Sequence, residues 1–182
     1  KRDALRQIIR QEGVKNALIF CNRKRDVDIV HKSLQKHGYN SATLHGDMSQ
    51  PARMETMAKF KADEISLLVC SDVAARGLDI DDLGHVFNFD VPMHAEDYVH
   101  RIGRTGRAGK TGRSFTLASR EDKKFLDAIE EITGEKIRRI EFGNDRQPKT
   151  FINRDKTRKT RPSRDKAAQG PSSQSDYVSA ET

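Results

Sequence analysis

The sequence predicts an α/β fold in which a doubly wound, mostly parallel sheet of five or six strands carries helices on both faces, followed by a disordered basic tail. Short apolar runs alternate with segments that repeat apolar residues at helical spacing, which is typical of parallel strands joined by covering helices. The composition changes near Arg146, beyond which apolar residues are few. We therefore expect one folded domain over residues 1–145 and a tail over residues 146–182.

Five short apolar runs predict the strands of the sheet. Each is bounded by polar residues or glycine and is far shorter than a membrane-spanning segment. Cys21 and Cys70 lie inside two of these runs, with no cysteine or histidine at zinc-site spacing, so we expect two buried thiols in a reducing compartment and no metal site. The predicted strands are residues 16–22, 41–46, 66–72, 85–90 and 112–119.

Two helices are expected between the first three strands. Gly38 suits the end of the first, because glycine readily adopts the left-handed conformation that often follows a helix. Ser49 can cap the second, which has Pro51 in its first turn. The expected buried faces are Val27, Val30 and Leu34 in the first helix and Met54, Met57 and Ala58 in the second.

The last part of the domain is expected to hold two more helices. One covers residues 94–100, around Tyr98. The other follows Ser119 and Asp122, which form a Ser-x-x-Asp capping box, and it ends at Gly134. Its expected buried residues are Phe125, Leu126, Ile129 and Ile132.

The net charge of +7 is concentrated in the tail. Residues 146–182 hold nine Lys or Arg against four Asp or Glu, with too few apolar residues to offset the entropy cost of folding. We expect this segment to be disordered and to bind phosphates without sequence preference; a solvated linker end is the alternative. The sequence shows no secretory signal or long apolar segment, which predicts a cytoplasmic protein without membrane contact.

The segment HRIGRTGRAGKTG, residues 100–112, combines glycines, cations and a Gly-Lys-Thr triplet. A phosphate-binding P-loop requires G-x-x-x-x-G-K-[ST], because the intervening backbone N–H groups wrap the anion. The first glycine should then stand at position 104, where the chain has Arg104. The segment also follows a predicted helix and precedes a strand, the reverse of a P-loop. A P-loop phosphotransferase is therefore disfavoured, and the arginines need another role.

Polar clusters follow three of the predicted strands. They are CNRKRD (residues 21–26), HGDMSQPAR (45–53) and SDVAARGLD (71–79). In doubly wound sheets, functional groups collect at the carboxyl ends of the strands. We therefore expect these clusters to form one site face, which the segment 100–112 joins from a helix end.

Five segments in this order resemble motifs of the second RecA-like domain of the DEAD-box RNA helicases, of bacterial type, within helicase superfamily two. They are FCNRK, HGDMSQPAR, SDVAARGLD, FNFDVP and HRIGRTGR, and the resemblance covers residues 3–142. His100 favours the RNA branch, because DNA-unwinding relatives of the RecQ type usually have Gln there. Ser71 stands where the family commonly has Thr, and the hydroxyl is retained.

The resemblance implies that Arg104 and Arg107 are arginine fingers. They would act on ATP bound mainly by another domain, where a finger can contribute ~10³ to 10⁵ in rate. The two residues are three positions apart, which places both on one side of a helical or turn segment. A guanidinium offers forked donors that suit phosphate oxygens.

The resemblance also implies other residues near the nucleotide. Asp79 would accept hydrogen bonds from the ribose hydroxyls, Gly77 would let the backbone pass close to its neighbours, and Arg76 would tie this loop to the nucleotide side. His100 and Arg101 resemble residues that bind across the interdomain cleft. A basic surface turn is the alternative for Arg104 and Arg107, and a structural histidine is the alternative for His100.

RNA is expected along the other edge of the same face. Hydroxyls, backbone N–H groups and arginines contact phosphates without reading sequence. With 6% aromatic residues and no Trp, base stacking is not expected to dominate. The positions that match the family's RNA side are Asn22, Arg23, Gly46, Asp47, Arg53 and Ser71.

The sequence contains neither a Walker A lysine motif nor a D-E-A-D carboxylate set. We therefore expect the chain to be the C-terminal half of an ATP-dependent RNA helicase that hydrolyses ATP and unwinds short duplexes only when joined to an N-terminal RecA-like domain. That domain would hold ATP with its Mg²⁺, and the isolated chain would be inactive. A stand-alone RNA-binding or annealing module is the alternative. The tail is a candidate contact for ribonucleoprotein partners.

Overall fold

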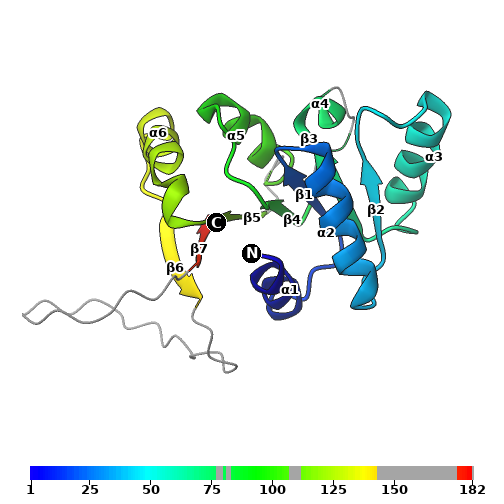
Figure 1. Cartoon of the computed structure of the whole chain (residues 1–182), viewed down its shortest axis with the longest axis horizontal. Helices are drawn as coiled ribbons and strands as arrows, with labels where there is room; N and C mark the ends of the chain where they lie inside the picture. Colours follow the sequence, from blue (N-terminus) through cyan, green and yellow to red (C-terminus); the bar gives the residue numbers. More distant parts are fainter. Residues whose placement is uncertain (77–79, 81–82, 107–111, 143–175, 182) are drawn as a thin grey trace, which may run out of the picture.

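A central sheet carries helices on both of its faces (Figure 1). The computed structural model describes residues 1–76, 80, 83–106, 112–142 and 176–181. The strand order is β2-β3-β1-β4-β5-β7-β6. The strands are β1 (Ala17–Cys21), β2 (Ser41–Leu44), β3 (Leu67–Ser71), β4 (His85–Asn88), β5 (Arg113–Ala118), β6 (Arg138–Phe142) and β7 (Asp176–Glu181).

The five predicted strands are all present, and they form the parallel part of the sheet. All five residues of β1 are buried, as expected for a central strand covered on both faces. The predicted parallel sheet with helices on both faces is therefore confirmed for this part of the chain. Two strands beyond the five, β6 and β7, pair antiparallel and bring the sheet to seven strands, one more than the upper expectation.

The position of β7 corrects, at its C-terminal end, the prediction of a tail without structure. Residues 176–181 pair with β5 on one side and with β6 on the other. The segment 176–181 lacks the apolar content of a core strand. The edges of β5 and β6 nevertheless supply backbone hydrogen-bond partners on both of its sides, and backbone pairing does not depend on the side chains. The rest of the predicted tail, residues 146–175 and 182, lies outside the described residues.

The helices are α1 (Arg2–Gln11), α2 (Lys24–Lys36), α3 (Gln50–Lys61), α4 (Asp72–Ala75), α5 (Ala95–Ile102) and α6 (Lys123–Thr133), with a short 3₁₀ turn at Arg120–Asp122. Helix α1 is not among the elements predicted from the sequence. Its Leu5, Ile8 and Ile9 are buried at helical spacing, although polar residues separate Leu5 from the two isoleucines in the sequence.

Successive side chains along each strand point to opposite faces of the sheet, which divides the core into a cluster on each face. Ile19 and Val69 pack with the buried residues of α1 and α2, whereas Leu18 and Leu68 pack with those of α3 and α4. A third cluster joins α5 to α6. Cys21 and Cys70 are buried in β1 and β3, as predicted, and burial raises the pKa of both thiols.

Two predicted buried faces are partly wrong. Met54 is 65% exposed and Ala58 is also exposed, while Phe60 is the buried residue of α3, with Met57 packed partly against the core. This helix lies beside the edge strand β2, where the sheet offers little apolar surface (Figure 1). Ile132 in α6 is likewise 52% exposed.

The predicted helix ends are confirmed. The Ser49 hydroxyl accepts a hydrogen bond from the Ala52 N–H at 3.4 Å, and Gly38 follows α2 with φ of +80°. Gly134 ends α6 with φ of +71°. Both bonds of the capping box are present: the Asp122 N–H donates to the Ser119 hydroxyl oxygen, and the Ser119 N–H donates to Asp122 Oδ2 at 2.8 Å. The Ser119 hydroxyl also donates to Asp122 Oδ2 at 2.9 Å.

We predict that Asp122→Ala lowers the free energy of unfolding by about 1 kcal/mol, the usual cost of losing a cap. Burial alone raises the pKa of Asp122, but the Ser119 N–H and the Lys1 ammonium outweigh it and lower the pKa below its usual 3.8. The carboxylate therefore contributes stability above that value and loses it as pH falls through the depressed pKa. Urea denaturation from neutral pH downward measures this, with Glu121→Ala as control. A deficit that does not change with pH would contradict the assignment.

Candidate functional site

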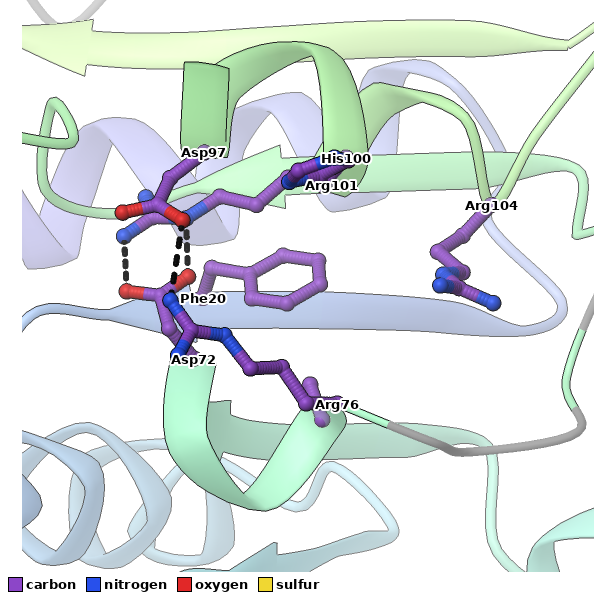
Figure 2. A pocket seen from close by; sticks show the side chains of 8 residues that line it. Phe20, Asp72, Arg76, Asp97, His100, Arg101 and Arg104 are labelled. Carbon is purple, nitrogen blue, oxygen red and sulfur yellow. Dashed lines mark hydrogen bonds and ion pairs between the residues drawn. The ribbon is translucent and has the colours of Figure 1, made fainter. Parts of the chain in front are cut away.

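A pocket of about 220 Å³ opens at the carboxyl ends of the parallel strands, between α4 and α5 (Figure 2). One wall comes from the end of β1 and the short helix that follows β3, and the other from α5 and the residues just after it. The lining residues are Phe20, Asp72, Ala75, Arg76, Asp97, His100, Arg101 and Arg104.

A buried guanidinium lies at the base of this pocket. Arg101 is only 2% exposed although it is charged. Its Nε donates to Asp72 Oδ1 and its Nη2 to Asp72 Oδ2, both at 2.6 Å, which is the planar fork that a carboxylate accepts best. Figure 2 shows the two side chains facing each other across the pocket.

The remaining donors of Arg101 reach two other strand ends. Nη1 donates to the Asp90 carbonyl at 2.8 Å and to Asn88 Oδ1 at 3.3 Å, at the end of β4. Nη2 donates to Asn22 Oδ1 at 2.8 Å, just after β1. The guanidinium also lies over the Phe20 ring, 5.3 Å from its centroid. Arg101 thus ties the carboxyl ends of β1, β3 and β4 to α5.

Two residues that the sequence assigns to ligand binding are engaged inside the domain. Arg101, which is expected to bind across the interdomain cleft, uses all five of its N–H donors within the domain. The Asn22 amide is engaged as well: it accepts from Arg101 and donates to the Val91 carbonyl at 2.9 Å, and its backbone N–H donates to Asp90. Asn22 is therefore a structural partner of Arg101, because a buried charge has to satisfy its donors locally. The interdomain role of Arg101 and the RNA contact of Asn22 stay predictions.

Arg76 and His100 line the mouth of the pocket. Arg76 Nη2 lies 3.3 Å from Asp97 Oδ1, and the Arg76 side chain is 71% exposed. Its cationic head therefore stands over the pocket opening, held by α5 (Figure 2). Gly77, Asp79 and Arg107, which the sequence also assigns to the nucleotide side, lie outside the described residues.

Arg104 extends toward the pocket from the residues that follow α5 (Figure 2). Its backbone is held on two sides: its N–H donates to the Arg101 carbonyl at 3.2 Å, and its carbonyl accepts from the Leu83 N–H at 3.2 Å. The Thr105 hydroxyl donates to the Leu83 carbonyl, which adds a further tie. The segment that carries Arg104 is therefore fixed relative to Arg101.

Gly112 is a positioning residue that sequence reasoning missed. A Cβ atom there would overlap Thr105 Oγ1 and the backbone nitrogen of Gly106, and would lie 2.9 Å from Thr105 Cβ. Only glycine permits this approach, so Gly112 preserves the position of the segment next to Arg104. Asp97 was missed as well, since a carboxylate in the first turn of a helix has no distinctive sequence signal.

The predicted RNA residues other than Asn22 lie at neighbouring strand ends. Ser71 ends β3, Arg23 follows β1, and Gly46 and Asp47 occupy the turn after β2. Arg53, in α3, donates from Nη2 to the Ala74 carbonyl of α4 at 3.2 Å. These residues therefore share the edge of the sheet with the pocket, on the side of β2 and β3.

The described part of the chain contains no cluster of three or more His, Cys, Asp or Glu side chains arranged to hold a metal ion. The two carboxylates of the pocket already pair with Arg101 and Arg76. Within the same residues, no helix has the length and apolar character needed to cross a membrane.

Residues 1–109 match the helicase conserved C-terminal domain family. The chain belongs to this family. The domain is a RecA-like C-terminal domain of the DEAD-box type, which agrees with its relatives and with structures of similar fold.

One relative is the DEAD-box ATP-dependent RNA helicase CshA of Bacillus licheniformis, 46% identical over 140 residues, which are 77% of this chain and 29% of the relative. The chain thus spans less than a third of that protein. A structure of the E. coli DEAD-box protein SrmB, bound to regulator of ribonuclease activity A, has a TM-score of 0.68 and 34% identity over 72% of this chain and 77% of that one. A DEAD-box helicase domain 2 bound to an RNA duplex has a TM-score of 0.65 and 29% identity over 74% of this chain and 54% of that one.

We predict that Asp72→Ala lowers the free energy of unfolding of this domain by about 3–5 kcal/mol, because it leaves the Arg101 charge buried without its partner. Asp97→Ala is the matched control, since it removes a carboxylate of the same pocket whose partner Arg76 is mostly exposed, and it should cost about 1 kcal/mol or less. Urea denaturation of both variants measures the difference. Equal losses would show that Arg101 does not depend on Asp72.

Proposed function

We propose that this domain is the C-terminal half of an ATP-dependent RNA helicase. It contributes arginine donors to ATP that an N-terminal RecA-like domain holds, and it forms half of the RNA-binding surface. The observation that carries this proposal is the anchored position of Arg104 at a pocket beside Arg76 and His100, at the same strand ends as the RNA-side residues.

The charge distribution of the pocket supports the nucleotide role. Asp72 is occupied by the buried Arg101, so among the described lining residues the remaining carboxylate is Asp97, whose ion pair with the exposed Arg76 a phosphate can exchange. A triphosphate brought to this wall by another domain would meet forked guanidinium donors. The paired carboxylates do not suit Mg²⁺, and we assign the ion that accompanies ATP to the N-terminal domain.

The RNA role rests on the types of donor at the other strand ends. Ser71 offers a hydroxyl, Arg23 and Arg53 offer cations, and the turn after β2 offers backbone N–H groups, all of which bind phosphate without reading bases. In the described residues, the N–H groups of Gly46 and Asp47 make no intramolecular hydrogen bond. They lie just before the Ser49-capped start of α3, where partial positive charge favours an anion.

The Arg101 contacts supply a physical link between the two roles. Ser71 immediately precedes Asp72, which binds Arg101, and the Arg104 N–H donates to the Arg101 carbonyl. RNA-side and nucleotide-side residues are therefore attached to one buried group. Docking the domain on ATP would then place its RNA-side residues at the same time, which is the coupling that a helicase needs.

A stand-alone RNA-binding or annealing module is the second candidate. It accounts for the RNA-side residues, but it gives no reason for an arginine held at a separate pocket. The following experiment distinguishes the two functions.

In the protein that joins this domain to its N-terminal RecA-like partner, we predict that Arg104→Ala reduces ATP turnover at least ~10³-fold, the lower range for loss of an arginine finger. Arg104→Lys should restore little, because a point charge does not reproduce the planar fork. RNA affinity of this chain should be nearly unchanged. Arg53→Ala is the matched control and should weaken RNA binding while sparing turnover at saturating RNA. If Arg104→Ala impairs RNA binding as strongly as turnover, the segment is an RNA clamp instead.

A separate prediction concerns the basic residues between positions 146 and 166. Replacing these nine Lys and Arg by Ser leaves the sequence of β7 unchanged and should weaken RNA binding and flatten its salt dependence, by about 0.7 in slope for each phosphate that is no longer neutralised. Titration of labelled single-stranded RNA at several salt concentrations measures both quantities. Unchanged affinity and slope would exclude this segment from RNA binding.

A further inference from the structure

A carboxylate lies among the residues proposed to bind RNA phosphates. Asp47 occupies the turn after β2, which the Met48 N–H closes by donating to the His45 carbonyl at 3.2 Å. Its side chain is 59% exposed. The hydrogen bond with Lys24 lowers the pKa of Asp47, so the carboxylate is charged at neutral pH. A fixed negative charge on a phosphate-binding surface opposes binding unless something neutralises it.

The neutralising group is Lys24, in the first turn of α2. Lys24 Nζ lies 2.7 Å from Asp47 Oδ2. The pair joins the polypeptide after β1 to the turn after β2, and in the sheet these two strands flank β3, which ends at Ser71. Lys24 also follows Arg23 directly in the chain. The ammonium is therefore placed among the proposed phosphate donors, with a carboxylate bound to it.

An ion pair of this kind is easily exchanged. The Lys24 side chain is 67% exposed, and exposed pairs are weakened by hydration and salt. A phosphate oxygen is an equally good acceptor for an ammonium group. The N–H groups of Gly46 and Asp47, which have no hydrogen-bond acceptor among the described residues, lie in the same turn, so a phosphate that bound there would approach Lys24 closely.

We propose that Asp47 competes with RNA phosphate for Lys24, and that this competition lowers both the RNA affinity of the domain and its salt dependence. The inference rests on the proposed RNA binding. When RNA displaces Asp47, the freed carboxylate takes up a cation while the phosphate releases one, so the contact adds little to the salt slope. Without the Asp47 charge, the Lys24 ammonium binds the phosphate without a competing carboxylate.

The test measures binding of the chain to single-stranded oligouridine over a range of salt concentrations. Asp47→Asn keeps the backbone N–H and the side-chain shape, and it should tighten binding about two- to five-fold at low salt and steepen the slope by about 0.7. In the Lys24→Gln background, the same substitution should give a smaller gain and no comparable change in slope.

Asp127→Asn is the matched control, because Asp127 pairs with Lys123 at 2.6 Å on α6, with similar exposure, at the other end of the molecule from α3 (Figure 1). It should leave binding nearly unchanged. The proposal is overturned if Asp47→Asn changes binding no more than this control, if its gain and slope change persist in full without Lys24, or if it weakens binding, which would make Asp47 itself a ligand. If the unaltered chain shows no salt-dependent RNA binding, the proposed RNA role falls together with this inference.

Discussion

The buried guanidinium of Arg101 is the constraint on which the site depends. Taking a guanidinium out of water is costly unless every donor finds an acceptor, and Arg101 finds them at three different strand ends. The bidentate contact with Asp72 supplies the opposite charge, and amide and carbonyl oxygens satisfy the other donors. Removing any one partner leaves an N–H donor of Arg101 without an acceptor, so α5 and the three strand ends form one unit.

This arrangement separates positioning from ligand binding. Asp72 and Asn22 both accept hydrogen bonds from Arg101. The proposed ligand residues lie beside them in the chain: Arg104 comes three residues after Arg101, and Ser71 directly precedes Asp72. The positions of the proposed ligand residues thus depend on a group that contacts neither ATP nor RNA in the proposed mechanism. A polar residue at a strand end can therefore position the ligand-binding residues without contacting the ligand itself.

The features that were predictable from sequence are those set by local patterns. The five parallel strands follow from short apolar runs, and the ends of α2, α3 and α6 follow from Gly38, Ser49 and Gly134. Tertiary contacts decided the rest. Arg101 points inward because three strand ends converge on it, Met54 faces solvent because α3 lies at the edge of the sheet, and β7 forms because β5 and β6 leave room between them. None of these facts has a signature within a short window of sequence.

The place of β7 decides which strand edges the sheet leaves open. β7 pairs with β5 on one side and with β6 on the other, so it covers the edge of each that faces it. An unpaired strand edge can pair with another chain, which promotes aggregation. Loss of residues 176–181 would expose both edges, at the end of the sheet farthest from β2.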